Sequence, residues 1–543
     1  MMKRKTSFFV SLLIVLTVVL AACSGGNKEK AGDKSETTEP KAGGTLIYGR
    51  GADSIGLDPI NITDGESIRV THNIFETLFV YDDKLKLQPK LAESSQVSED
   101  GLTWTLTLKK GVKFQDGTDF NADAVVFNFE RWMDPANPYH KGDFPYYPFL
   151  YGGFKGDPNH KIASVKAVDE STVEITLTER TAPFLSYLAI PMFGIASPDA
   201  IKKYGDKFYE NPVGTGPFKF ESWSRNDKVV LKKNENYYVN GQPYLDEMIF
   251  RVIPDNSSRL TALQSGEVDI IDGLNPDDAD TIKANSQLSL IKRPSFNTGF
   301  MVFNTQMAPF DNVKVRQAIN MAINKKELID AFYNGYAEVA KNPFPSSLWG
   351  YNDKIEDYQY DVEAAKKLLA EAGFPNGFKT ELWTMSNPRP YLPQPLKIAE
   401  AMQANLKAIG IDAEIKTYEW ATYLQKTGEG EHPMALYGWT GVMADPDNFL
   451  FPNLSNTNIE KPASNRAFYN NEEFTMLLQQ ARTTFDQDER IKLYQQAQEI
   501  FHQDAPWVTI GHTTPPMGLA GYVKGFKAHP MENDNFAEVY LTN

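Results

Sequence analysis

Hydrophobic and polar residues alternate in two different ways along this chain. Between about residues 45 and 290, short runs such as Leu102–Leu108 and Val173–Leu177 alternate with a period of two and lie between turn residues. Such alternation is typical of strands with one buried face. From about residue 300 to 505, runs with helical spacing alternate with strand-like runs. This second pattern predicts a sheet connected by helical crossovers.

The clearest predicted helix lies at residues 361–373. Asp361 is a capping residue, and Gly373 ends the helical spacing. The apolar face consists of Val362, Ala365, Leu369 and Ala372. A strand is predicted at 379–385, then a helix at 396–408 and a strand at 411–415.

The organisation that follows is a mixed α/β fold of two lobes. We predict lobe I at 45–297 with an extra subdomain, lobe II at 298–508, and a return to lobe I at 509–543. Two chain crossings then connect the lobes as a hinge, and a cleft between hinged lobes is a place to enclose a ligand.

The N-terminus predicts export. Met1–Lys5 is basic, and the apolar run Phe8–Leu20 is shorter than the roughly 20 residues that span a bilayer. We therefore predict a signal peptide at 1–22. The run ends in Leu-Ala-Ala before Cys23, the only cysteine, and this resembles the lipobox of bacterial lipoproteins. The resemblance implies cleavage before Cys23 and a diacylglycerol on its sulfur; an ordinary signal peptide with an incidental cysteine is the alternative.

Residues 24–44 contain no large apolar side chain, so residues 23–44 are expected to form a flexible, lipid-anchored tether. The protein would then contact the membrane only through its lipid, on the outer face of the cell membrane. The lysines of the tether favour a Gram-positive surface.

Composition narrows the possible partners. The hydrophobic content of 41% and charged content of 23% are ordinary for a soluble globular protein. The net charge is −15, although residues 1–43 are net basic, so the folded part is strongly acidic. Such a surface repels phosphate backbones, and nucleic acid is not an expected partner.

No catalytic or metal-binding pattern stands out. The histidines are at 72, 140, 160, 432, 502, 512 and 529, without a metal-ligand spacing, and no G-x-S-x-G is present. Gly214-Thr215-Gly216 is interpreted as a tight turn between strands, and Asp445-Pro446-Asp447-Asn448 as a turn and helix cap. We expect neither an enzyme nor a cofactor.

Several motifs resemble one known family. They are the stretch Asp100–Val125, Pro212–Phe218, Gly266–Asp269, Phe303–Thr305 and Pro309–Ile319. They are similar to motifs of the peptide-binding proteins of ABC importers, which include oligopeptide, dipeptide, nickel, haem and glutathione binders. The resemblance implies a monomeric protein of two lobes that closes over a peptide and delivers it to the transmembrane subunits of a permease.

The dipeptide-binding branch is the most similar one, on the basis of Arg389-Pro390-Tyr391, Tyr418-Glu419-Trp420 and Gly438-Trp439-Thr440-Gly441. The resemblance implies that Arg389 pairs with the C-terminal carboxylate of the ligand. It also implies an aspartate directly after Gly441 for the α-amino group, and here that position is Val442. The expected ligand-binding residues are Arg389, Tyr391, Trp439, Thr440, Gly441, Val442 and Asp445.

Physical chemistry supports a role for Arg389. Prolines at 388 and 390 stiffen its loop, and its five N–H donors match a carboxylate in bidentate fashion. A surface arginine in a proline-rich loop is the alternative.

Val442 makes the ligand uncertain, because a buried ammonium without a partner costs roughly 2–5 kcal/mol. Asp445 could reach the ammonium, the peptide could be longer, or the ligand could be glutathione-like, a nickel chelate or haem. Val442 could also point into the core of its lobe.

Overall fold

The computed structural model describes residues 40–543. The predicted signal peptide, the lipidation of Cys23 and most of the tether lie outside the described residues. Residues 41–543 form one compact unit. Within residues 40–543, no helix combines the length and the apolar character needed to cross a bilayer.

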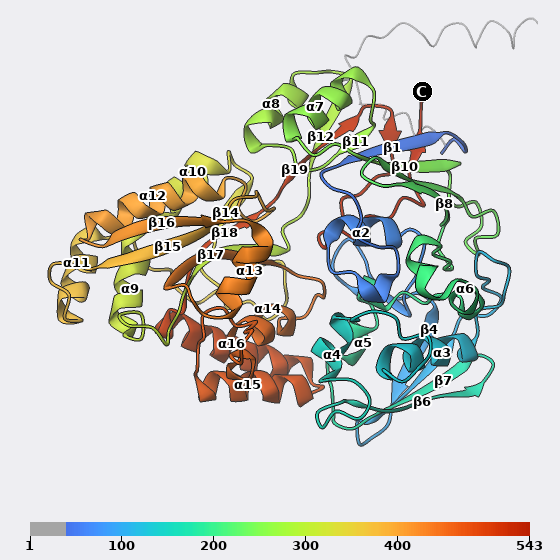
Figure 1. The fold of residues 1–543 in the computed structure, drawn as a ribbon, viewed down its shortest axis with the longest axis horizontal. Helices are drawn as coiled ribbons and strands as arrows, with labels where there is room; N and C mark the ends of the chain where they lie inside the picture. Colours follow the sequence, from blue (N-terminus) through green and yellow to red (C-terminus); the bar gives the residue numbers. More distant parts are fainter. Residues whose placement is uncertain (1–39) are drawn as a thin grey trace, which may run out of the picture. The chain divides into compact units, whose positions relative to one another are not determined.

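The first lobe is built on a seven-stranded mixed sheet (Figure 1). In spatial order its strands are β12 (Leu288–Lys292), β19 (Pro516–Ala520), β11 (Ile270–Ile271), β1 (Thr45–Arg50), β10 (Glu247–Val252), β9 (Lys228–Lys233) and β8 (Phe218–Ser224). The N-terminal strand β1 is parallel to β10 and β11, whereas β19, from the other end of the chain, is antiparallel to β11 and β12. Both ends of the described chain therefore belong to this lobe.

An extra subdomain is inserted into the first lobe. Its antiparallel sheet has the order β4 (Ala92–Val97), β5 (Thr103–Leu108), β7 (Thr172–Leu177) and β6 (Ile162–Asp169). The hairpin β2 (Phe79–Tyr81) and β3 (Leu87–Pro89) precedes it, and β20 (Val523–Lys524) pairs with β21 (Tyr540–Leu541) near the C-terminus. The two alternating runs singled out in the sequence are β5 and β7, which pair in register from Thr103↔Thr176 to Thr107↔Thr172.

The second lobe is built on a six-stranded sheet. Its order is β14 (Ala337–Val339), β18 (Trp507–Thr513), β13 (Asn297–Phe303), β17 (Met434–Thr440), β15 (Lys379–Met385) and β16 (Asp412–Tyr418). The strands β15, β16 and β17 are parallel to one another, and β13 is antiparallel to both β17 and β18.

The chain passes between the two sheets at residues 293–296 and again at residues 514–515. The second crossing lies later than the predicted boundary at 509, because β18 continues to Thr513 as an inner strand of the second sheet. The residues next to the two crossings are hydrogen-bonded to each other: Asn297 Oδ1, at the start of β13, accepts a hydrogen bond of 3.0 Å from the Thr513 backbone at the end of β18.

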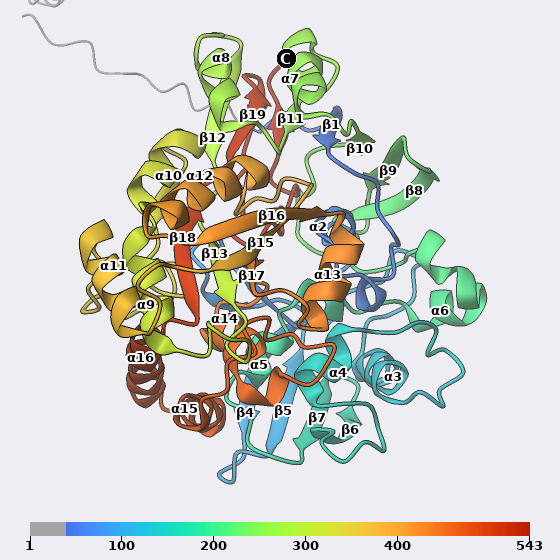
Figure 2. The same cartoon turned by 60° about the vertical axis from the view of Figure 1, so that its left-hand side comes forward.

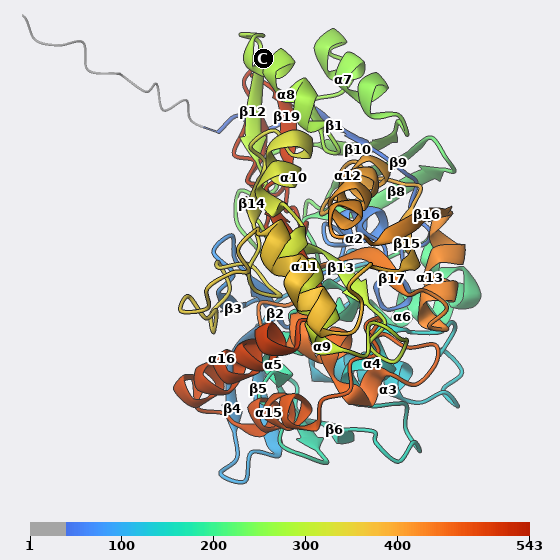
Figure 3. The same cartoon turned by 90° about the vertical axis from the view of Figure 1, so that its left-hand side faces the viewer.

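Helices pack around these sheets. Those before residue 290 are α2 (Gly65–Thr71), α3 (Ala122–Met133), α4 (Tyr146–Tyr151), α5 (Phe184–Tyr187), α6 (Pro198–Tyr204), α7 (Asn256–Ser265) and α8 (Ala279–Lys283). Those of the second lobe are α9 (Val313–Ala322), α10 (Lys325–Phe332), α11 (Val362–Glu371), α12 (Pro395–Ala408), α13 (Trp420–Gly428), α14 (Asp447–Leu454), α15 (Glu472–Thr483) and α16 (Gln487–Asp504). Figure 3 shows α9 and α11 side by side.

The helix predicted at 361–373 is α11. Asp361 caps it, since its side chain accepts a hydrogen bond of 2.9 Å from the Ala364 backbone. Ala365 and Leu369 are buried, as the spacing predicts. The predicted strand at 379–385 is β15, and the predicted helix and strand that follow are α12 and β16.

The interpretation of Gly214–Gly216 as a turn between two strands is wrong. The segment leads from a short 3-10 helix, Gly205–Glu210, into β8 and lies against the backbone of residues 73–75. A Cβ atom at Gly214 would lie 2.3 Å from the Ile74 carbonyl oxygen, and one at Gly216 would lie 2.7 Å from the Asn73 oxygen. The two glycines therefore allow a close backbone approach.

Candidate ligand site

The predicted ligand residues lie in the loop after β15 and at or just after the end of β17, two neighbouring strands of the second sheet. Because β15, β16 and β17 are parallel, their carboxyl ends meet at one edge. The Arg389 loop follows β15, Trp420 follows β16, and Gly441 follows β17. The two chain crossings reach the same edge, since β13 starts and β18 ends there. The fold thus brings Arg389 and the Gly438–Val442 segment together beside the two chain crossings.

Arg389 is held face-on against Trp420. Its guanidinium carbon lies 3.7 Å from the centre of the Trp420 ring, which is a cation–π contact. The residue is half-buried, and its Nε is buried without a hydrogen-bond partner. Within residues 40–543 its guanidinium has no ion-pair partner. Stacking uses the face of the group and leaves its in-plane N–H donors for an anion.

The backbone on both sides of Arg389 is fixed. Arg389 and Leu392 exchange two backbone hydrogen bonds of 3.0 Å. Thr513 Oγ1, at the end of β18, donates a hydrogen bond of 2.9 Å to the Pro390 carbonyl oxygen. The Arg389 loop is therefore attached to the strand end that leads into the second crossing.

Tyr391, in the same loop, anchors it to the interior of the lobe. It is buried, its carbonyl oxygen accepts a hydrogen bond of 3.1 Å from the Tyr333 hydroxyl, and burial raises the pKa of its own hydroxyl. Its ring lies so close to Gly438 that a Cβ there would be 2.1 Å from the ring. The first glycine of the Gly-Trp-Thr-Gly motif thus makes room for Tyr391.

The end of β17 is shaped by similar close packing. Gly441 donates a backbone hydrogen bond of 3.0 Å to Phe296, and a Cβ at Gly441 would lie 2.3 Å from the Phe296 ring. Trp439 and Thr440 are both half-buried. Trp439 pairs with Thr298 and Thr440 with Asn297 of β13.

Asn448 fixes the segment that carries Val442. Its Oδ1 accepts hydrogen bonds from the Val442 backbone at 2.9 Å and from the Trp439 indole at 3.4 Å. Sequence reasoning interpreted Asn448 only as part of a turn and helix cap, and missed this role. The signal that was available is the short distance in sequence to the Gly-Trp-Thr-Gly motif. Val442 itself is half-buried and packs partly against the core.

The expected ligand role of Asp445 is not supported by its contacts. Asp445 is buried, and its Oδ2 lies 2.8 Å from Arg490 Nη1 of α16. Its Oδ1 accepts from Arg490 Nη2 at 3.0 Å and from the Asp447 backbone at 3.0 Å. A carboxylate paired in this way is not free for a ligand ammonium, so Asp445 is left out of the proposed site.

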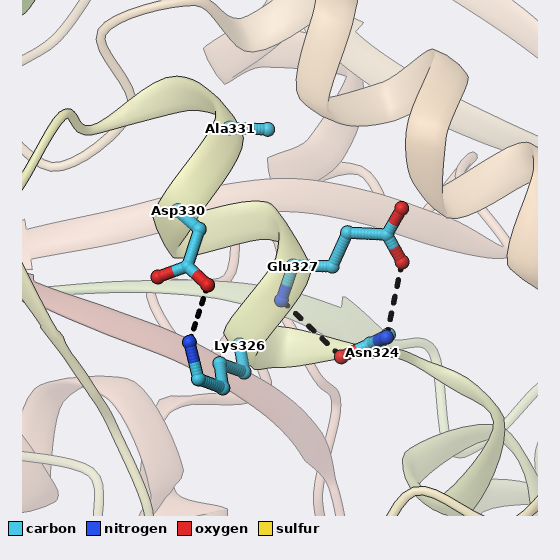
Figure 4. Close-up of a pocket in the computed structure, with 5 residues that line it drawn as sticks. All are labelled: Asn324, Lys326, Glu327, Asp330 and Ala331. Atoms are coloured by element: carbon cyan, nitrogen blue, oxygen red, sulfur yellow. Dashed lines mark hydrogen bonds and ion pairs between the residues drawn. The ribbon is translucent and has the colours of Figure 1, made fainter.

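A surface depression elsewhere is lined by Asn324, Lys326, Glu327, Asp330 and Ala331 (Figure 4). Lys326 pairs with Asp330, and Asn324 bonds with Glu327, so these polar groups satisfy one another. None of the predicted ligand residues lines it. No group of three or more His, Cys, Asp or Glu residues in the described part of the chain is arranged to hold a metal ion.

Two sheets joined by two chain crossings, with Arg389 at the strand edge beside them, form an arrangement suited to binding a ligand. Residues 86–461 match the family described as "Bacterial extracellular solute-binding proteins, family 5 Middle". The chain belongs to this family, which confirms the resemblance and the mixed helix-and-sheet fold class.

Two relatives are each 38% identical to this chain. The "Heme-binding protein A" of Haemophilus influenzae matches over 96% of this chain and 97% of its own length. The "Dipeptide-binding protein" of Escherichia coli matches over 92% and 94%. Among solved structures, the periplasmic binding protein DppA of Helicobacter pylori in complex with the peptide STSA is 38% identical, with a TM-score of 0.82. That comparison covers 93% of this chain and 99% of the other.

Proposed function

We propose that this protein captures short peptides outside the cell and delivers them to the transmembrane subunits of an ABC importer, as a monomer and without catalysis. The observation that carries the proposal is the Arg389 guanidinium, which is stacked on Trp420 and lacks an ion-pair partner within residues 40–543. A positioned arginine without a partner suits the C-terminal carboxylate of a peptide.

The proposed ligand is not a simple dipeptide. Val442 cannot pair with an ammonium, and Asp445 is held by Arg490. We infer a peptide whose amino end is bound away from Val442, which a peptide longer than two residues allows. The similar Helicobacter pylori structure contains the four-residue peptide STSA, which is consistent with this choice. A glutathione-like peptide, a nickel chelate and haem remain the competing ligands.

Native mass spectrometry of the protein purified from its own host tests the ligand class, followed by a thermal-shift screen from dipeptides to pentapeptides. A ligand at 100 times its Kd stabilises the folded state by about 2.7 kcal/mol. We expect a copurified peptide and thermal shifts with peptides of three or more residues. If only haem, a chelate or a sugar shifts the melting temperature, the peptide proposal is wrong while the family assignment stands.

We also propose that the protein is a lipoprotein, on the basis of Leu-Ala-Ala-Cys at the end of a short apolar run. Cys23→Ala should release the protein into the medium or leave an unprocessed precursor, because the sulfur carries the lipid. Cell fractionation and the mass of the N-terminus measure this, with Ser24→Ala as the matched control. Membrane fractionation and maturation like the wild type would contradict the anchor.

A further inference from the structure

The loop that follows β17 is in contact with the first lobe. It also starts at the sheet edge where the carboxyl ends of β15, β16 and β17 lie. Tyr81, at the end of β2, is buried; burial raises the pKa of its hydroxyl, and hydrogen bonding from Ser186 and from the Ala444 backbone opposes that rise. Ala444 lies between Val442 and Asp445. The loop that carries Val442 therefore packs against a residue of the first lobe.

Arg482, in the last turn of α15, makes a second bridge between the lobes. Its Nε lies 3.4 Å from Asp447 Oδ1, at the start of α14 in its own lobe. Its Nη2 donates a hydrogen bond of 3.2 Å to the hydroxyl of Tyr187 in α5 of the first lobe. Its carbonyl oxygen accepts a bond of 2.7 Å from the Ala182 backbone, also in the first lobe.

The Asp447–Arg482 pair is deeply buried. The side chains of Arg482 and Asp447 are 12% and 6% exposed, and the Arg482 guanidinium carbon lies 3.8 Å from the centre of the Phe451 ring. Burial raises the pKa of Asp447, and the positive charge of Arg482 opposes that shift. Removing one partner from such a pair is costly, so the position of Arg482 is coupled to the position of Asp447.

The neighbouring turn between α15 and α16 adds apolar contact. The Phe485 ring meets the Trp104 ring edge-on, with centres 5.9 Å apart, and the Arg180 guanidinium lies 4.8 Å from its centre. Trp104 and Arg180 both belong to the first lobe. One chain crossing follows β12 and the other precedes β19. Figures 1 and 2 show α15 and α16 at the opposite end of the unit from β12 and β19. Rotation about the hinge would separate contacts at this distance from it most.

We propose that Arg482 is a positioning residue that stabilises the closed arrangement of the two lobes. It links Asp447, which directly follows the loop that carries Val442, to Tyr187 and Ala182 of the first lobe. The proposal rests on the proposed ligand capture. A ligand that orders the Val442–Asn448 loop then favours closure through this bridge. The apparent affinity for the ligand scales with the population of the closed state. It therefore depends on the Arg482 bridge, although the ligand does not contact Arg482.

Tyr187→Phe tests the bridge with a minimal change, since it removes one hydroxyl from a buried ring. Tyr147→Phe is the matched control, because the buried Tyr147 hydroxyl bonds to His160 Nε2 at 2.9 Å within the first lobe. Backbone hydrogen exchange is measured in the ligand-free mature protein at Ala182 and at residues 447–454. With Tyr187→Phe we expect about tenfold faster exchange at both segments, which lie in different lobes, and no change there with Tyr147→Phe. An unchanged rate at either segment, or an equal effect of the control, overturns the proposal.

Calorimetric titration with the peptide Ser-Thr-Ser-Ala gives the second readout. Tyr187→Phe and Arg482→Gln should weaken binding about five- to tenfold, while Tyr187→Phe lowers the ligand-free melting temperature by no more than about 2 °C. A lowered melting temperature with unchanged affinity means that the bridge is only structural and overturns the proposal. If no peptide binds even to the wild type, the proposed function fails, and the exchange experiment alone decides on the bridge.

Discussion

Replacing Arg389 by alanine should abolish the thermal shift that a peptide ligand gives the wild-type protein. The guanidinium has no ion-pair partner within residues 40–543, so its charge is available to a ligand carboxylate. Truncating one member of a hydrogen-bonded charge pair costs about 2–5 kcal/mol, or roughly thirtyfold to several thousandfold in affinity. Calorimetric titration and a melting curve measure the loss.

The stability of the ligand-free protein should change little in Arg389→Ala. Arg389→Ala removes the contact with Trp420, and a cation–π contact at such a site contributes about 0.5–1 kcal/mol. The ligand-free melting temperature should therefore fall by no more than about 2 °C. A large fall would mean that Arg389 is structural.

Two further variants make the result specific. Arg389→Lys keeps the charge but loses the planar pair of donors, so we expect intermediate affinity. Arg225 is a matched control because its guanidinium carbon lies 3.4 Å from the centre of the Trp223 ring, outside the proposed site, and it pairs with Glu210. Arg225→Ala should leave peptide binding unchanged. Wild-type affinity in Arg389→Ala would remove the main support for a peptide carboxylate at this edge.

Local patterns predicted four elements of the second lobe, namely α11, β15, α12 and β16. The cap at Asp361, the apolar spacing of α11 and the strand-like run of β15 are each decided by residues a few positions apart. Arg389 and Gly441 lie close together because β15 and β17 are parallel neighbours, so that both strands end at the same edge. Strand–helix–strand patterns favour such parallel pairing. These predictions depended on short sequence distances or on a general rule of topology.

Partners far apart in the sequence could not be predicted in the same way. Asp445 was expected to face a ligand, but its partner Arg490 lies 45 positions further on, in a helix with no local sign of the pair. The packing of Tyr391 against Gly438 and the bridge from Arg482 to Tyr187 also join distant segments. Such contacts depend on how complete elements pack, and hydrophobic periodicity does not specify this.

The end of β18 illustrates the same limit. The sequence after residue 508 continues with strand-like composition through the second crossing, so its pattern does not show where one sheet ends and the other begins. In the structure, Thr513 is still paired with Ala337 of β14, and Pro516 already pairs with Lys292 of β12. Only the pairing partners distinguish the two strands.

Val442→Asp should raise the affinity for a dipeptide about ten- to hundredfold. The new carboxylate would lie on the segment next to the Arg389 edge and could pair with the ligand ammonium, and a hydrogen bond to a charged group contributes about 1.5–3 kcal/mol. Affinity for the native ligand should fall if that ligand places apolar atoms against Val442, because the carboxylate would then be desolvated without a partner.

The position of Val442 allows both possible outcomes of this substitution. It is half-buried, its backbone N–H is held 2.9 Å from Asn448 Oδ1, and it packs partly against the core. If its side chain serves mainly that packing, an aspartate there would lower the melting temperature without improving binding. Val442→Asn separates the two roles, since it matches aspartate in size but carries no charge. Titration of Ala-Ala into the three proteins, with a melting curve for each, should show a gain with aspartate alone. No gain together with equal destabilisation by both variants would show that Val442 is structural, and the choice of longer peptides would then lose its basis.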